Sequence, residues 1–223
     1  MRTTGPFDFA LMSKILTNKF VLCPAACAVL PPVLMPLAQY AVLAPWGSSL
    51  FLLVEMIFVM GCMFGVAGIV LGGIITCRHA TRTQGVLLLI CSIIYCPATM
   101  LGYCLGEKVR EQAFHQFTQR SAPLVAAIRD YDSKHGQPPS SLDVLVPEWL
   151  PQVPWTGIGG YPNCRYALPT QPGQYEGNEW VLIVETGHGL NFDTIMYLPR
   201  QNYPRQGYGG SLQPIDDWAY VHE

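Results

Sequence analysis

Long apolar runs fill the first half of the chain and alternate with short polar breaks. Three of them, residues 20–44, 50–76 and 84–106, are each long enough to cross a bilayer as a helix, since about 20 apolar residues suffice. From residue 107 the pattern becomes a polar mixture with helical periodicity. We therefore predict a three-span membrane domain, residues 20–106, between a short amphipathic tail, residues 1–19, and a soluble head, residues 107–223.

Prolines mark the first predicted span. Each proline removes a backbone donor and tends to kink a helix, and the carbonyls freed in this way must be satisfied by neighbouring helices in lipid. We expect this span to be bent and packed against the others. In the turn that follows, Ser48 or Ser49 can cap the second span. The prolines are Pro24, Pro31, Pro32 and Pro36.

Small residues form a stripe along the second span, where they let another helix approach closely. This stripe predicts either a seam for self-association or packing inside one chain. A stripe of small residues on the third span favours packing inside the chain. The helix-packing glycines are Gly61, Gly65, Gly68 and Gly72, and the matching positions are Gly85, Ser92, Cys96, Thr99 and Gly106.

Glu55 is the one carboxylate inside the predicted spans. A carboxylate at membrane depth is costly, so Glu55 is a candidate intramembrane functional or structural residue. It lies less than two turns into the second span, near the outer end. We predict a structural role in which Glu55 faces Lys108 and Arg110, where the third span leaves the membrane.

Lysine and arginine positions predict the orientation. The tail carries Arg2, Lys14 and Lys19, the second loop carries Arg78 and Arg82, and the first loop has neither residue type. The positive-inside rule places tail and second loop in the cytoplasm. Three crossings then put the head outside the cytoplasm, in a multi-pass protein of a cell inner membrane whose surroundings are the lipid bilayer.

The head begins with a helical pattern that continues from the third span, with Pro123 as either a new start or a kink. Gly136 and the prolines after it stop this helix. Ser140 or Ser141 can cap a short helix that follows, and strand patterns come after it, with a long loop at 199–214. A helix followed by antiparallel strands is an α+β fold. The apolar helix positions are Val109, Ala113, Phe117, Leu124, Ile128 and Tyr131, and the strands are 164–168, 180–186, 192–198 and 218–222.

Composition narrows the classes of function. Only 13% of the 223 residues are charged, against about 25% in ordinary soluble domains. The head carries 8 Lys and Arg against 13 Asp and Glu, a formal charge of −5, which argues against nucleic acid as a partner. Cys164 is the only cysteine of the head, so we expect no disulfide within it and interpret Cys164 as a half-buried strand residue.

The sequence contains no clear motif for catalysis or for cofactor binding. The histidines lack metal-ligand spacing, no Ser or Cys lies in a nucleophile motif, and Gly157–Gly160 is too short to cradle a phosphate. We therefore predict no catalytic residues, no metal and no cofactor. Asp216 and Asp217 are interpreted as turn residues. Four tryptophans could line a ligand groove, although core packing is favoured: Trp149, Trp155, Trp180 and Trp218.

Two segments resemble known bacterial families. The string Leu124–Tyr131, then Gly136–Pro139, Leu145–Pro147 and Tyr166–Leu168 resembles type II secretion pseudopilins and related type IV pilin-like proteins. The resemblance implies a long helix packed on an antiparallel sheet and continuous with a membrane segment, and it makes a calcium site conceivable. Separately, residues 61–106 resemble a bacterial small-membrane-domain family of unknown function.

The chain departs from pilin precursors at the membrane. The residues before Gly85 mimic a short basic leader, but the fifth residue after Gly85 is Ile90 rather than Glu, and two more spans precede it. We therefore infer a pilin-like head on a permanent anchor. The favoured function is a non-enzymatic accessory or scaffold of an envelope or secretion assembly, with protein partners or self-association through the spans. The alternative is a membrane sensor whose head binds a ligand and signals through a partner.

Overall fold

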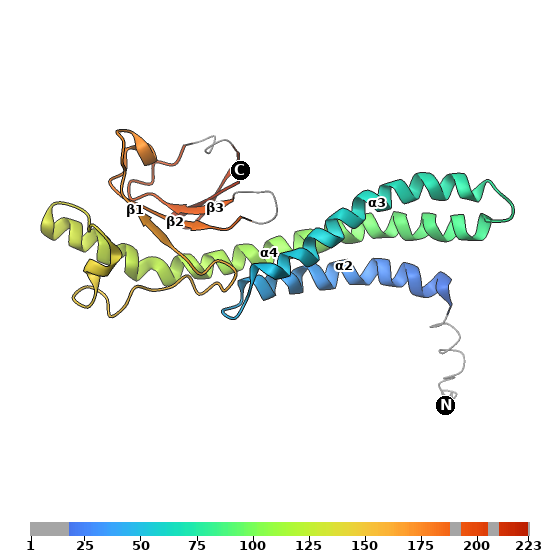
Figure 1. Cartoon of the computed structure of the whole chain (residues 1–223), viewed down its shortest axis with the longest axis horizontal. Coiled ribbons are helices and arrows are strands. Elements are labelled where there is room, and N and C mark those ends of the chain that lie inside the picture. Colours follow the sequence, from blue (N-terminus) through green and yellow to red (C-terminus); the bar gives the residue numbers. More distant parts are fainter. Residues whose placement is uncertain (1–17, 188–192, 205–209, 223) are drawn as a thin grey trace, which may run out of the picture. The chain divides into compact units, whose positions relative to one another are not determined.

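The computed structural model describes residues 18–187, 193–204 and 210–222. The predicted amphipathic tail lies outside these residues except for Asn18 and Lys19. Within them, three long apolar helices precede a five-stranded antiparallel sheet that lies against the last helix (Figure 1), so the predicted fold class is confirmed. The helices are α2 (Lys19–Leu43), α3 (Leu52–Thr76) and α4 (Arg82–His135).

Each of the three helices is long and apolar enough to span a membrane. The four prolines of the first predicted span all lie inside α2. Ser48 caps the second span, because its hydroxyl accepts a hydrogen bond of 3.3 Å from the Leu50 backbone N–H. A short 3-10 turn, η1 (Ser49–Phe51), precedes α3.

The chain divides into two compact units. Among the described residues, those of 18–38 and 53–106 form the membrane unit, and those of 39–52 and 107–222 form the head unit. The sequence placed the connector between α2 and α3, Gln39–Leu52, in the membrane domain, whereas its contacts group it with the head. The chain therefore passes between the two units at three points, after residues 38, 52 and 106.

Helix α4 belongs to both units and is unbroken over 54 residues, with Pro97 and Pro123 inside it. The predicted continuity of the third span with the head helix is thus confirmed. Gly136 ends α4 in the left-handed region, at a φ of 68°, where glycine has no steric penalty. The first head segment beyond it is the 3-10 turn η2 (Leu142–Leu145).

The core of the head lies between α4 and one face of the sheet. All six apolar positions predicted on the head helix belong to this core, with Phe117, Leu124 and Ile128 fully buried. Burying each such side chain contributes about 1.5–3 kcal/mol. Aromatic rings continue the core across the sheet, with neighbouring ring centroids 4.9–5.6 Å apart from Phe117 through Trp218 and Tyr197 to Trp180.

The sheet has the strand order β1-β2-β3-β5-β4, and each neighbouring pair is antiparallel. Strands β2 and β3 pair directly, as the predicted hairpin requires, although residues 188–192 of its turn lie outside the described ranges. The strands are β1 (Arg165–Ala167), β2 (Val181–Glu185), β3 (Thr194–Tyr197), β4 (Leu212–Ile215) and β5 (Trp218–Val221).

Strand β2 is buried on both faces. Leu182 and Val184 face the core shared with α4, whereas Val181 and Ile183 belong to a second, smaller cluster on the opposite face. Tyr175 and Tyr203 cover that cluster. A continuous apolar run in place of strict alternation follows from this double burial.

Strand β4 corrects the sequence prediction, which assigned residues 199–214 to a loop. Proline cannot donate a ladder hydrogen bond, which makes Pro214 unfavourable in the interior of a sheet. In the structure β4 lies at the edge of the sheet, where a proline is tolerated because one side of the strand pairs with no other described strand. Asp216 and Asp217 form the predicted turn between β4 and β5.

Candidate functional site

The glycine stripe of α3 lies against α4. A Cβ added at Gly61 would come 2.3 Å from the Tyr95 hydroxyl, and one at Gly68 would come 2.4 Å from Ser92 Oγ. At Gly65 the nearest atom is Cys96 Sγ, at 3.1 Å, and at Gly72 it is Leu89 Cγ, at 2.9 Å. The four glycines therefore allow close approach within one chain, and Ser92 and Cys96 belong to the matching stripe named from the sequence.

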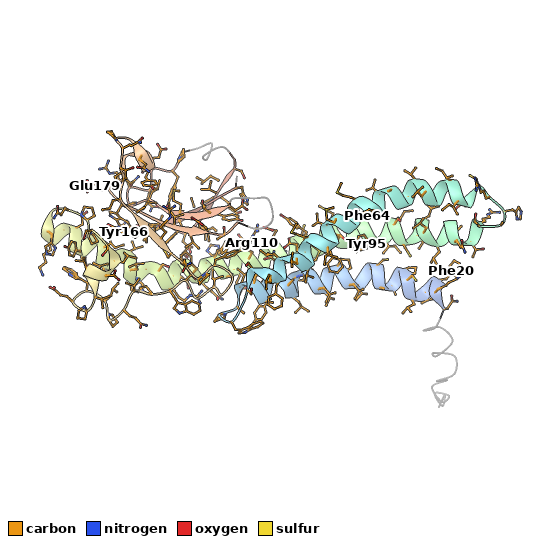
Figure 2. All side chains as sticks on the ribbon, in the orientation of Figure 1. Phe20, Phe64, Tyr95, Arg110, Tyr166 and Glu179 are labelled. Atoms are coloured by element: carbon orange, nitrogen blue, oxygen red, sulfur yellow. The ribbon has the colours of Figure 1, made fainter. Side chains whose placement is uncertain are left out.

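Polar groups also join α3 and α4 in the membrane unit. The hydroxyl of Tyr95, a residue of α4 (Figure 2), donates to the Phe58 carbonyl of α3 at 3.1 Å. Within α4, Thr99 Oγ1 donates to the Tyr95 carbonyl at 3.0 Å. Helix α2 approaches α4 at Gly102, where a Cβ would lie 2.5 Å from the Pro31 carbonyl oxygen. Phe64 is 73% exposed on α3, as a side chain that faces lipid would be.

Glu55 lies in the first turn of α3 and is only 6% exposed. A carboxylate in this position is favoured by the positive end of the helix dipole. Its predicted neighbours, Lys108 and Arg110, belong to the head unit, so the pairing of Glu55 with them stays a prediction. Arg110 itself is buried, forms an ion pair with Glu107 and lies over the Tyr220 ring, with Cζ 5.2 Å from the ring centroid.

The connector between α2 and α3 docks on the head through its backbone. The Gly159 N–H donates to the Ala44 carbonyl at 3.0 Å, and the Gly160 N–H donates to the Val42 carbonyl at 2.8 Å. A Cβ at Gly159 would lie 2.3 Å from the Gly47 nitrogen, and one at Gly160 would lie 2.5 Å from a Val42 methyl carbon. Only glycines permit so close an approach of two backbones.

From the sequence, Gly157–Gly160 was tested only as a possible phosphate-binding loop. Its contact with the turn at Gly47 was not predicted. A signal was nevertheless present, since glycines in a loop can indicate a close backbone approach. What the sequence lacked was the partner. The two segments are more than 100 positions apart, and only the tertiary structure brings them together.

Asp193 is the centre of a buried polar cluster in the head. Its side chain is 1% exposed, and its Oδ2 accepts a hydrogen bond of 2.6 Å from the Tyr220 hydroxyl. The ring nitrogen Nδ1 of His222 lies 3.4 Å from the same oxygen. Burial raises the pKa of Tyr220, so its phenol stays protonated and donates to the carboxylate. A cavity of about 520 Å³ opens beside Asp193 and is lined by Ser49, Tyr161 and Glu185 among others.

The tryptophans that the sequence singled out occupy different environments. Trp180 and Trp218 are buried in the main core, as the packing interpretation expects. Trp149 is partly buried against the same core and lies near Tyr131. Trp155 is 53% exposed in the loop before the glycines.

The cysteines and the possible metal ligands are the remaining residue types with functional chemistry. Cys164 packs against the core one residue before β1, and burial raises the pKa of its thiol to about 12. All eight cysteines lie in the described ranges and are free thiols. Among the described residues, no three His, Cys, Asp or Glu side chains come together as a metal site.

Comparison of the chain with protein-family models, with curated proteins and with solved structures finds no match. The resemblance of the head to pseudopilins therefore rests on the residues quoted for it. What stands independently of the resemblance is a multi-pass membrane protein with a C-terminal β-sheet domain.

Proposed function

We propose that the chain is a non-enzymatic accessory or scaffold subunit of a bacterial envelope or secretion assembly, and that its head acts by binding other proteins. The observation that carries the proposal is the docking of the α2–α3 connector on the glycine loop of the head. The head is thereby built from two separate parts of the chain, residues 39–52 and 107–223.

This construction suits a protein that presents a preformed binding surface. A surface that must be ordered on binding loses conformational freedom, whereas a pre-organised surface loses less. Residues 39–52 and residues 107–223 belong to one compact unit, so the surface that they form does not depend on a partner for its order. The pilin-like resemblance of the head supports a place in an envelope assembly, and the charge pattern of the loops supports an extracytoplasmic head.

Native gels of the crosslinked, tagged full chain, extracted from membranes in a gentle detergent, test the scaffold proposal. We expect the wild type to migrate in a stoichiometric complex with another envelope protein. The informative variant is Gly159→Leu, which displaces the connector from the loop and leaves the spans unchanged. We expect it to lose the complex, while Asn163→Ala, an exposed residue beyond the loop, retains it.

Two results would contradict the scaffold proposal. One is a wild type that migrates as a chain without partners after crosslinking. The other is a Gly159→Leu variant that keeps the complex although its connector has become sensitive to protease.

The second candidate function is a membrane sensor whose head binds a ligand. It is favoured by a cleft of about 370 Å³ between α4 and the sheet, a size in the range of small-molecule sites. A rise in the melting temperature of the full chain in the presence of a small molecule, lost when Arg129 in the cleft is replaced by Gln, would support the sensor. No rise with any small molecule of a screened set would count against it.

A further inference from the structure

The connector between α2 and α3 is uncharged and carries exposed apolar side chains. Residues 39–52 contain no Asp, Glu, Lys, Arg or His, whereas the loop between α3 and α4 carries Arg78. Trp46 is 67% exposed, and Leu50 is 72% exposed. Phe51 is exposed too, and its ring meets the Trp46 ring at a right angle with the centroids 6.4 Å apart. Water is a poor environment for so much apolar surface within one turn.

The lengths of the two helices place the ends of the connector at the membrane surface. The candidate spans Lys19–Leu43 and Ser49–Thr76 contain 25 and 28 residues. At the rise of a helix these are roughly 37 and 42 Å long, and a bilayer with its headgroups is about 40–45 Å thick. The charged loop at Arg78 keeps one end of the second span at the headgroups of one leaflet, so the other end reaches the headgroups of the opposite leaflet.

The segment between these two spans is too short to rise far into water. It consists of Ala44–Ser48 alone. An extended chain advances at most about 3.6 Å per residue, so a segment of this length that leaves the membrane and returns rises by less than about 10 Å. The Gly47 N–H donates to the Ala44 carbonyl at 2.8 Å, which closes the segment into a turn. Trp46, in the middle of the turn, therefore stays close to the headgroups.

Hydrogen bonds suit the backbone of the connector to this layer. The Ala44 N–H donates to the Tyr40 carbonyl at 2.8 Å, and the Phe51 N–H donates to the Ser48 carbonyl at 3.1 Å. The carbonyls of Val42 and Ala44 accept from the two glycines of the head loop. Unpaired backbone groups exclude irregular segments from lipid, so these bonds remove much of the cost of inserting the turn.

We propose that the connector is a lipid-inserted edge of the head unit. The side chains of Trp46, Leu50 and Phe51 lie among the headgroups and the first carbons of the acyl chains, and the partner of this surface is the phospholipid bilayer. Tryptophan suits this depth because its ring is apolar and its N–H is polar. The loop at Gly159 and Gly160, which is hydrogen-bonded to the connector, is thereby held at the bilayer surface. The inference requires that α2 and α3 span the membrane, and it rests on neither function proposed above.

Tryptophan fluorescence of the full chain in phosphatidylcholine nanodiscs tests this inference. The emission of Trp46 is the difference between the wild type and Trp46→Phe, and Trp149→Phe gives that of a control ring. Trp149 packs near Tyr131, which lies roughly 37 Å along α4 beyond residue 106, the end of the third span. Phospholipid brominated near the carbonyl end of its acyl chains should quench most of the Trp46 emission and leave the Trp149 emission unchanged. Iodide in the water should quench Trp46 little.

A thiol at position 50 gives a second readout that does not depend on Trp46. Leu50→Cys and Gln171→Cys both place a cysteine where the native side chain is exposed, so the two would react alike with a water-soluble maleimide if both faced water. In the lipid layer the thiol stays protonated and the reagent is excluded. We therefore expect Leu50→Cys in nanodiscs to be labelled at least about tenfold more slowly than Gln171→Cys. Mass spectrometry separates this label from that on the native cysteines.

The proposal is overturned if iodide quenches most of the Trp46 emission and brominated lipid does not. It is overturned equally if Leu50→Cys is labelled as fast as Gln171→Cys. Either result would place the connector in water. The scaffold proposal would be untouched, because it depends on the docking of the connector on the glycine loop and not on lipid.

Discussion

At the scale of single residues, two aspartates of the head, the buried Asp193 and the exposed Asp216, are held by specific polar contacts. Tyr220 and His222 contact the Asp193 carboxylate, and Thr118 and His115 contact the Asp216 carboxylate. A buried polar group without partners costs about 1–3 kcal/mol, so the contacts of Asp193 help to specify where the start of β3 lies against β5. Asp216 has the additional feature of a positive φ, 52°, which Asp and Asn tolerate better than most residues.

Hydrogen bonds from Thr118 and His115 lower the pKa of Asp216, which predicts how stability responds to acid. A carboxyl whose pKa is lower in the folded state stabilises the fold at pH values above its unfolded pKa, about 3.9, and the contribution is lost as pH falls through the folded value. We therefore expect the wild type to lose more unfolding free energy between about pH 5 and pH 2 than Asp216→Asn does. Thermal unfolding of the full chain at a series of pH values measures the difference.

Thr118→Val gives the matched comparison, because it keeps the carboxylate and removes the hydroxyl that donates to it. Its dependence on acid should lie between those of the wild type and Asp216→Asn. Equal acid sensitivity in all three proteins would show that this hydrogen bond does not act on stability in the way described.

At the scale of elements, helix packing in the membrane unit depends on which side of α3 a glycine occupies. Gly72 and Gly73 are neighbours in the sequence with opposite surroundings. A Cβ at Gly72 would lie 2.9 Å from Leu89 Cγ and 3.1 Å from backbone atoms of α4, whereas a Cβ at Gly73 would meet nothing within 4 Å. Without a hydrophobic driving force in lipid, such close backbone contact is a main source of helix association.

The pair Gly72→Leu and Gly73→Leu tests this packing. Gly72→Leu forces α3 and α4 apart and should destabilise the chain by about 1–3 kcal/mol, the usual cost of overpacking. Gly73→Leu adds an apolar side chain toward lipid and should change stability little. Thermal unfolding in detergent micelles measures both, and similar losses in the two variants would mean that the glycine stripe does not set the contact.

At the scale of the whole molecule, the chain links its two units three times, and the loop charges predict the side of the membrane on which the head lies. The predicted arrangement places the loop at Cys77 in the cytoplasm and the head outside it. Cys164 is a poor reporter of this arrangement, since it is half-buried and the pKa of its thiol is about 12. A reactive thiolate requires a more exposed position.

An exposed cysteine on the head, Gln171→Cys, therefore tests the orientation together with the native Cys77, which is exposed. In intact cells, an impermeant maleimide should label Gln171→Cys and should reach Cys77 only after the membrane is permeabilised. The control is Gln171→Ser, which should give no label on intact cells. Labelling of Cys77 but not of position 171 from outside would invert the proposed topology.

The sequence by itself determined the features that depend on local pattern. Apolar run lengths placed the three spans, periodicity from Val109 to Tyr131 identified the core face of α4, and Gly136 marked its end. These predictions succeeded because burial in lipid gives a continuous apolar run, and burial against one face of a sheet gives apolar residues at helical spacing. Both patterns are visible in neighbouring residues of the sequence.

Tertiary structure decided what depends on distant partners. Strand β4 was missed because its proline is acceptable only at a sheet edge, and edge position is a property of the assembled sheet. The connector at Gln39–Leu52 became part of the head through hydrogen bonds with Gly159 and Gly160, which no local pattern specifies. The same holds for the cleft that Arg129 and Asp217 line, since α4 and the last hairpin border it only when they pack together.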